Sequence, residues 1–476
     1  MEEATRNPVR GSLKAYLMVA GSFLGGLLVA FLLSAKTELP REAVFMGGIF
    51  ALACLLWVTE ALPLFATSLL VIALQMILLA NPGGWIGLGF EAGESPGYRD
   101  ILKVAADPVM LLFFGGFLLA RAAVKERVDR VLSLLFLQPF KGSPALMLFG
   151  IMLVTAVFSM WMSNTATTAM MMALISPIVL QLPEESPFRT GLTLSVPFAA
   201  NIGSVGTPIA SPPNAVAVGF LSKEGFSVGF LKWMLVGIPL LILVMGFCWM
   251  LLWFYFKPRE GEVKITLAAE KLAPRGVIVV VTFTVTVLLW LTGSWHGLPS
   301  PVVAILPAVV LTATGVLNRE DLQKLDWHVL ILIAGGISLG SGIQMTGLDR
   351  FITGFLPGGD EGGSKLLIPL LGMTLVMSTF MSNTASANLL IPIGVAGALA
   401  SGAGGIHPVA MAVSIAMVAS LSMALPISTP PNAIAFASGA IKTRDMVKVG
   451  GLVGIFGLIL VSLFGGPLMR LMGLLN

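Results

Sequence analysis

Apolar residues dominate this 476-residue chain and run in long stretches between short polar segments. A helix needs about 17 to 25 apolar residues to cross a bilayer, and many stretches reach that length. Nine simple spans are predicted at 15–34, 43–59, 63–80, 106–122, 231–256, 276–295, 300–317, 327–347 and 449–470. The short alternating segments of a transmembrane β-barrel are not found. The pattern therefore predicts an all-α polytopic membrane protein.

Two apolar stretches, 143–182 and 364–400, are interrupted in their middle by polar residues. Each is either a pair of spans joined by an intramembrane turn or a re-entrant hairpin. Polar backbone at membrane depth is tolerated only where protein or a watery cavity satisfies it. We therefore expect each interruption to face a central cavity rather than lipid.

The interruptions belong to a set of paired motifs that occur in the same order in both halves of the chain. The first members are Ser163-Asn164-Thr165, then Ser211-Pro212-Pro213-Asn214, preceded by Gly115-Gly116. The second members are Ser382-Asn383-Thr384, then Thr429-Pro430-Pro431-Asn432, preceded by Gly335-Gly336. Matched polar breaks in two apolar halves predict a transporter built from two repeats, with its substrate site between them.

The adjacent prolines remove amide donors and disfavour helix before them. We therefore expect the stretches 191–220 and 408–440 to be broken, near 203–213 and 425–431. The freed carbonyls could bind Na⁺, or neighbouring side chains could repair a simple kink. The Ser-Asn-Thr motifs leave a similar alternative, because an isolated copy could be a plain helix N-cap.

Composition and charge agree with a membrane protein. Hydrophobic residues make up 56% of the chain, charged residues make up 11%, and the mean hydropathy is +0.94; soluble domains are about 25% charged. Most cations lie in connections such as 121–141 and 257–275, whereas the loop 81–103 is Gly-rich and acidic. This bias predicts a cytoplasmic N-terminus and an external C-terminus, with eleven spans, two hairpins and inverted repeats. It does not indicate nucleic-acid binding.

The motif-bearing stretches lack fixed charge: 143–182, 191–222 and 366–441 contain no Lys, Arg, Asp or Glu. Intramembrane carboxylates are the usual proton relays, so proton coupling has no carrier here. Hydroxyls, amides and half-helix ends without a charge suit an anion bound together with Na⁺. The chain has no HExxH motif, and we expect neither an enzyme nor an organic cofactor. Paired breaks also favour alternating access over a channel.

On these motifs and the turn from Trp57 to Pro63, the whole chain resembles the divalent anion/sodium symporter (DASS) family of di- and tricarboxylate transporters. The resemblance implies a bacterial homodimer in the inner (plasma) membrane that moves its substrate as an elevator. It implies scaffold parts at 1–140 and 231–363 and transport-domain parts at 141–230 and 364–476. One departure is Ser211, where the family often has threonine, and there we expect only altered substrate fit.

The resemblance also implies site residues and a substrate. One sodium site would use Ser159, Ser163, Asn164 and the backbone near Gly203, and the other Ser378, Asn383 and the backbone near Ser428. The substrate cradle would comprise Ser163, Asn164, Thr165, Ser382, Asn383, Thr384, Thr429 and Pro430. The expected function is sodium-coupled uptake of a C4-dicarboxylate such as succinate, malate or fumarate. A sodium-independent dicarboxylate or citrate exchanger on the same fold is the alternative.

Overall fold

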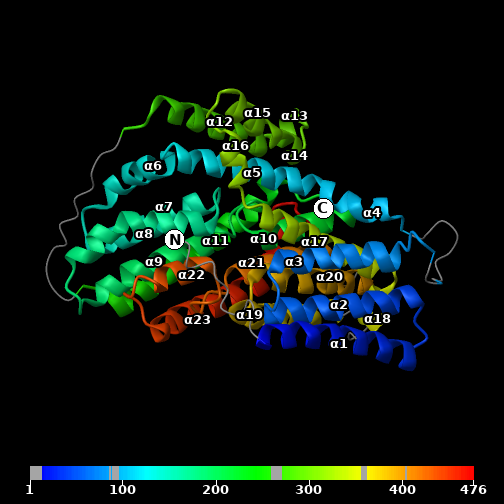
Figure 1. Cartoon of the computed structure of the whole chain (residues 1–476). Coiled ribbons are helices and arrows are strands. Elements are labelled where there is room, and N and C mark those ends of the chain that lie inside the picture. The colour runs from blue at the N-terminus through cyan, green and yellow to red at the C-terminus, as the bar shows by residue number, and fades with distance from the viewer. Residues whose placement is uncertain are drawn as a thin grey trace.

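The structure is a computed structural model that describes residues 13–84, 87, 96–258, 271–354, 362–402 and 405–475. The regular elements among these described residues are all helices, and none is a strand. This confirms the predicted all-α class (Figure 1). Much of the predicted loop 81–103 and of the basic connection 257–275 lies outside the described residues. The described end of that loop is not a coil, because it forms α4 (Tyr98–Leu102) and a 3₁₀ turn (Lys103–Ala106).

Eight of the described helices are long and apolar enough to cross a membrane. They are α1 (Leu13–Lys36), α2 (Arg41–Thr59), α5 (Pro108–Lys125), α11 (Phe230–Phe256), α12 (Pro274–Leu291), α17 (Trp327–Met345), α20 (Asn383–Ala400) and the segment Thr443–Leu471, which begins with α23 (Thr443–Leu460). All but α20 coincide with predicted simple spans.

The predicted spans at 63–80 and 300–317 are not single long α-helices. The first is α3 (Leu64–Leu74), which continues as a π-helix (Gln75–Leu79). The second is divided into α14 (Ser300–Val303) and α15 (Ile305–Ala313). Their apolar composition gave their place in the chain correctly, but hydropathy does not report helix type or a one-residue interruption.

The interrupted stretches form pairs of helices. Residues 143–182 give α7 (Pro144–Ser159) and α8 (Asn164–Gln181), and 364–400 gives α19 (Gly362–Phe380) and α20. Other short helices connect these elements: α6 (Val128–Leu137), α13 (Gly293–His296), α16 (Arg319–Gln323), α18 (Leu348–Gly354) and α24 (Gly466–Leu471). Each Ser-Asn-Thr motif therefore lies where the second helix of its pair begins, with the serine just before the helix and the asparagine and threonine in its first turn.

The proline-containing stretches are broken, as predicted. The first is α9 (Pro187–Gly203) followed by α10 (Pro212–Lys223), which matches the expected break at 203–213. The second is α21 (Pro408–Ser420) followed by α22 (Pro430–Phe436), so its break begins earlier than the expected 425. The reason is that Asn432 donates hydrogen bonds to carbonyls as far upstream as Met423 and thereby holds that segment unwound.

The glycine-pair helices pack across the halves of the chain. Helix α5, from the first half, packs on α14 and α15, and Gly115 lies so close to Ala304 that a Cβ there would collide with its backbone. Helix α17, from the second half, packs on α3, with Gly335 against Ser68. Figure 1 shows α12 and α15 along one long edge and α1 and α2 along the opposite one. Each glycine-pair helix therefore packs on helices of the other half of the chain.

A buried ion cluster joins α5 to α16. Asp321 lies 3.1 Å from Arg121 and 2.5 Å from Lys125, two cations of the predicted basic cluster. Burial opposes ionisation of the Asp321 carboxyl, but hydrogen bonds from Lys125, Asn318 and Arg121 hold its pKa below its ordinary value. These cations therefore have a structural partner in addition to any role in setting orientation.

Candidate functional site

The serines of both Ser-Asn-Thr motifs stand at helix N-caps without acting as side-chain caps. Ser163 precedes α8 and Ser382 precedes α20, and neither side chain accepts a cap hydrogen bond. Ordinary caps do occur in this chain, since Ser143 accepts from the Leu146 amide at the start of α7. The plain N-cap interpretation is therefore wrong for these two hydroxyls, which remain available to a ligand.

The first predicted sodium group comes together around Ser159, at the end of α7. Its Oγ lies 2.6 Å from Asn164 Oδ1 and 2.7 Å from the Ala200 carbonyl oxygen. A serine hydroxyl has one proton, so it cannot donate to both acceptors at once. Gly203 lies beside this group, and a Cβ there would sit 2.6 Å from the Ala156 carbonyl oxygen. The Asn164 Oδ1 and Ala200 carbonyl oxygens therefore compete for the single hydroxyl proton of Ser159.

The second predicted sodium group is equally buried but differently bonded. Ser378 Oγ and Asn383 Oδ1 are shielded from solvent and have no hydrogen-bond partner among the described residues. Ser428 Oγ donates to the Thr379 carbonyl at 2.6 Å and accepts from the Leu425 amide at 3.1 Å. The Ser428 hydroxyl is therefore engaged within the protein, and the role of the backbone near Ser428 in a sodium site stays a prediction.

The Pro-Pro-Asn asparagines hold both helix breaks in shape. Asn214 Nδ2 donates to the carbonyls of Ser204 and Thr207, each at 2.8 Å. Asn432 Nδ2 donates to the carbonyls of Met423, at 2.9 Å, and Leu425, at 2.8 Å. Side-chain repair of the break, the alternative to ion binding, therefore accounts for these four carbonyls.

Two polar links, which the sequence analysis did not find, join the breaks of the two halves. Asn201, at the end of α9, donates to Thr429 Oγ at 3.1 Å. Ser420, at the end of α21, lies 3.1 Å from Ser211 Oγ. Asn201 and Ser420 occupy equivalent places in the repeat, as do Ser211 and Thr429. The shared offset of about 219 residues was a signal that could have identified both.

The other predicted substrate residues differ in their exposure. Thr165 and Pro430 are exposed, whereas Thr384 and Thr429 are buried. Helix α22, which Thr429 begins, packs on α8 and α9, while α10 packs on α20 and α21. No hydrogen bond among the described residues joins one Ser-Asn-Thr motif to the other. Their substrate-binding roles stay a prediction.

The two motif-bearing turns also differ in what covers them. In the first turn, Trp161 stacks on Phe230 of α11 and on Trp290 of α12, with ring centroids 5.9 and 6.4 Å apart. The equivalent residue of the second half is Phe380, whose side chain is 67% exposed. Aromatic residues thus hold the first turn against neighbouring helices, whereas the Phe380 ring of the second turn is exposed.

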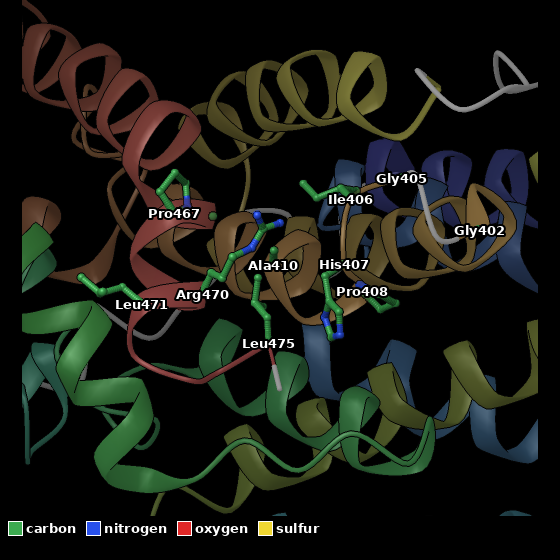
Figure 2. Close-up of a pocket in the computed structure, with 11 residues that line it drawn as sticks. Gly402, Gly405, Ile406, His407, Pro408, Ala410, Pro467, Arg470, Leu471 and Leu475 are labelled. Atoms are coloured by element: carbon green, nitrogen blue, oxygen red, sulfur yellow. The ribbon is translucent and has the colours of Figure 1, made fainter.

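A separate cavity of about 740 Å³ opens at the start of α21. Figure 2 shows Arg470 and His407 among its mostly apolar lining. Ala410, which also lines it, is ten residues before Ser420, or about 15 Å along a helix. His407 is already engaged as the cap of α21, where Nδ1 accepts from the Val409 amide at 3.2 Å. This cavity is not the predicted site.

Comparison with known proteins gives the family. The profile of the family described as "Sodium:sulfate symporter transmembrane region" matches residues 17–475. The chain belongs to the sodium:sulfate symporter family. Membership, together with the apolar helices, makes it a multi-pass membrane transporter and supports a sodium-coupled anion transporter.

Named relatives of this sodium:sulfate symporter family member cover most of the chain. An "Uncharacterized transporter" of Haemophilus influenzae is 32% identical, over 90% of this chain and 92% of its own length. The "Sodium-dependent dicarboxylate transporter SdcS" of Staphylococcus aureus (strain bovine RF122) is 30% identical, over 93% of this chain and 89% of its own.

Solved structures give the fold alone. The Alcanivorax borkumensis YdaH transporter is 13% identical with a TM-score of 0.52, covering 86% of this chain and 98% of its own. Neisseria gonorrhoeae MtrF is 12% identical with a TM-score of 0.53, covering 87% and 96%. The first is described as a transporter and the second as one of a class of antimetabolite efflux pumps, and at these identities the likeness concerns the fold only.

Proposed function

We propose that this protein couples inward movement of Na⁺ to uptake of a C4-dicarboxylate such as succinate, malate or fumarate. The observation that carries the proposal is a set of binding motifs without a fixed positive charge, since 143–182, 191–222 and 366–441 contain no Lys or Arg. A buried anion is costly unless a cation pairs with it, and a co-transported Na⁺ is such a cation. The substrate class draws support from the relative named as a sodium-dependent dicarboxylate transporter.

Two sodium sites are part of the proposal. The first comprises Ser159, Ser163, Asn164 and the backbone near Gly203, and the second comprises Ser378, Asn383 and the backbone near Ser428. The oxygen surplus around Ser159 supports the first site. The unpartnered Ser378 and Asn383 oxygens support the second, because leaving such a buried oxygen unbonded costs about 1–3 kcal/mol and a bound cation would offset that cost.

The proposed substrate cradle lies between the sodium sites. It comprises the serine, asparagine and threonine of both motifs together with Thr429 and Pro430. The uncapped hydroxyls of Ser163 and Ser382 are free to donate to carboxylate oxygens. The positive ends of the helices α8 and α20 add a modest attraction for an anion.

Alternating access follows from the same proposal. The transport-domain parts 141–230 and 364–476 move as an elevator against the scaffold parts 1–140 and 231–363, within a homodimer of the plasma membrane. The N-terminus lies inside and the C-terminus outside. The unequal covering of Trp161 and Phe380 supports a state in which one side of the site is held closed.

The test is uptake of labelled succinate by purified protein in liposomes, with and without an inward sodium gradient. We expect accumulation only with the gradient. Uptake without sodium that preloaded dicarboxylate or citrate stimulates would instead establish an exchanger. Competition by unlabelled sulfate but not by malate would replace the dicarboxylate with an inorganic anion.

A further inference from the structure

The polar links between the helix breaks are the starting point. Asn201 Nδ2 has two protons, and it donates to Thr429 Oγ and to Asn432 Oδ1, both at 3.1 Å. All three side chains are buried, with exposures of 1%, 4% and 0%. Buried polar groups of this kind are held to the hydrogen-bonding pattern that satisfies them all.

The orientation of the two side-chain amides follows from the hydrogen bonds that Asn432 makes. Asn432 Nδ2 uses both of its protons on the carbonyls of Met423 and Leu425. Asn432 must therefore present Oδ1, an acceptor, to Asn201. Asn201 in turn must present its amide protons rather than its oxygen. The backbone of the second break thus fixes which way both side-chain amides face.

The consequence falls on Thr429. A hydroxyl has two acceptor lone pairs and one proton. Thr429 Oγ accepts from Asn201 Nδ2 and, at 3.3 Å, from the backbone amide of Asn432. With both lone pairs engaged, the only remaining capacity of this hydroxyl is to donate. A carboxylate or another oxyanion is an acceptor-only partner that matches it.

The equivalent hydrogen bond between Ser211 and Ser420 has no neighbouring group among the described residues that fixes its direction. Ser211 and Ser420 are paired hydroxyls at 3.1 Å, and either one can be the donor. Ser211 also accepts no cap hydrogen bond at the start of α10. Its proton is therefore free to point either way, so the two breaks are matched in position but differ in hydrogen-bond polarity.

We propose that Asn201 is a positioning residue that fixes the Thr429 hydroxyl as a donor to an anionic oxygen of the substrate. The inference rests on the proposed function, because it takes Thr429 as part of the substrate cradle. Asn201 itself does not touch the substrate. It acts from the first half of the chain on a residue of the second, so substrate affinity depends on the contact between the two broken helices.

The test compares variants in the liposome uptake assay. Asn201→Ser rebuilds the hydroxyl pair of the other half and removes the fixed polarity. We expect its KM for succinate to rise about tenfold, which corresponds to ~1.4 kcal/mol, with an unchanged half-saturating sodium concentration. Ser420→Ala is the matched control on the equivalent link and should change KM less than about twofold.

A second variant separates positioning from a general structural effect. Adding Asn201→Ser to Thr429→Ala should raise KM no further, because the hydroxyl that Asn201 orients is already gone. An equal rise in both backgrounds, or a rise in the half-saturating sodium concentration, would overturn the inference.

The proposed function can fail separately. If the wild type takes up another dianion, such as sulfate, the same variants are measured with that anion, and the same KM pattern is expected. A wild type that takes up none of succinate, citrate and sulfate would overturn the proposed function and this inference with it.

Discussion

The two Ser-Asn-Thr turns share a sequence and a place in the repeat, yet their surroundings differ. In the first, Ser159 and Asn164 are in contact and Trp161 is stacked between α11 and α12. In the second, Ser378 and Asn383 have buried oxygens without partners among the described residues, and Phe380 is exposed. Identical motifs thus sit in unequal states within one chain. The comparison teaches that the first turn keeps a side-chain contact without a ligand, whereas the buried oxygens of the second have no partner among the described residues.

The largest expected effect comes from deleting the asparagines. Asn164→Ala and Asn383→Ala should each abolish sodium-dependent uptake, because each removes an amide oxygen from a proposed sodium site. Their stabilities should differ: only Asn164→Ala loses a contact that exists without sodium. Thermal unfolding in NaCl and in choline chloride measures this, and we expect the sodium-induced rise in Tm to shrink in both variants. Normal uptake by both would refute the site assignment.

A smaller but still large effect is expected at Gly203. An added Cβ would lie 2.6 Å from the Ala156 carbonyl oxygen and 3.0 Å from Ser159 Cβ, so α9 must shift away from α7. Gly203→Ala should raise the half-saturating sodium concentration at least about tenfold, or ~1.4 kcal/mol. The matched control is Ser422→Ala, at the equivalent position of the second half, where only a bond to the Val418 carbonyl is lost. Equal effects would mean that Gly203 is not special to the first site.

The aromatic contacts that Trp161 makes in the first turn should contribute to the free energy of unfolding. Trp161→Ala removes stacking on Phe230 and Trp290 and should lower the free energy of unfolding by about 2–3 kcal/mol, below the range for a fully buried tryptophan because Trp161 is only half-buried. Phe380→Ala, at the exposed equivalent, should change it by less than about 0.5 kcal/mol. Denaturant unfolding followed by intrinsic tryptophan fluorescence gives both values. A larger loss from Phe380→Ala would reverse the comparison.

The most selective effects concern the residues that begin the second parts of the broken helices. Thr429→Ala should weaken succinate binding about tenfold while leaving sodium binding nearly unchanged. Ser211→Ala should change either affinity less than about twofold, because the Ser211 hydroxyl has no fixed polarity. Equilibrium binding of labelled succinate at saturating sodium, with sodium titrated separately, provides the measurement. A selective loss of sodium affinity in Thr429→Ala would move this residue from the substrate cradle to an ion site.

Sequence patterns predicted the local features of the fold well. Apolar length located the spans, and the adjacent prolines located the break between Gly203 and Pro212, because both are properties of a short segment. The early end of α21 at Ser420 was missed, since a side chain nine residues after Met423 holds that segment open. The aromatic cover on Trp161 was missed because its partners are far away in the chain. The family resemblance grouped Ser159 with Asn164 and Gly203, but nothing in the sequence analysis paired Asn201 with Thr429.

The crossed packing of the glycine-pair helices has a consequence for biogenesis. Helix α5 completes its contacts only when α14 and α15 exist, and α3 only when α17 exists. When the first half has been synthesised, the faces of α3 and α5 that contact the second half are not yet packed. We therefore expect a partly assembled intermediate in the membrane until the second half is made. Neither half is then a self-sufficient folding unit. Two halves divided within the connection 257–275 and made together should reassemble into a working transporter, while either half made alone should be degraded.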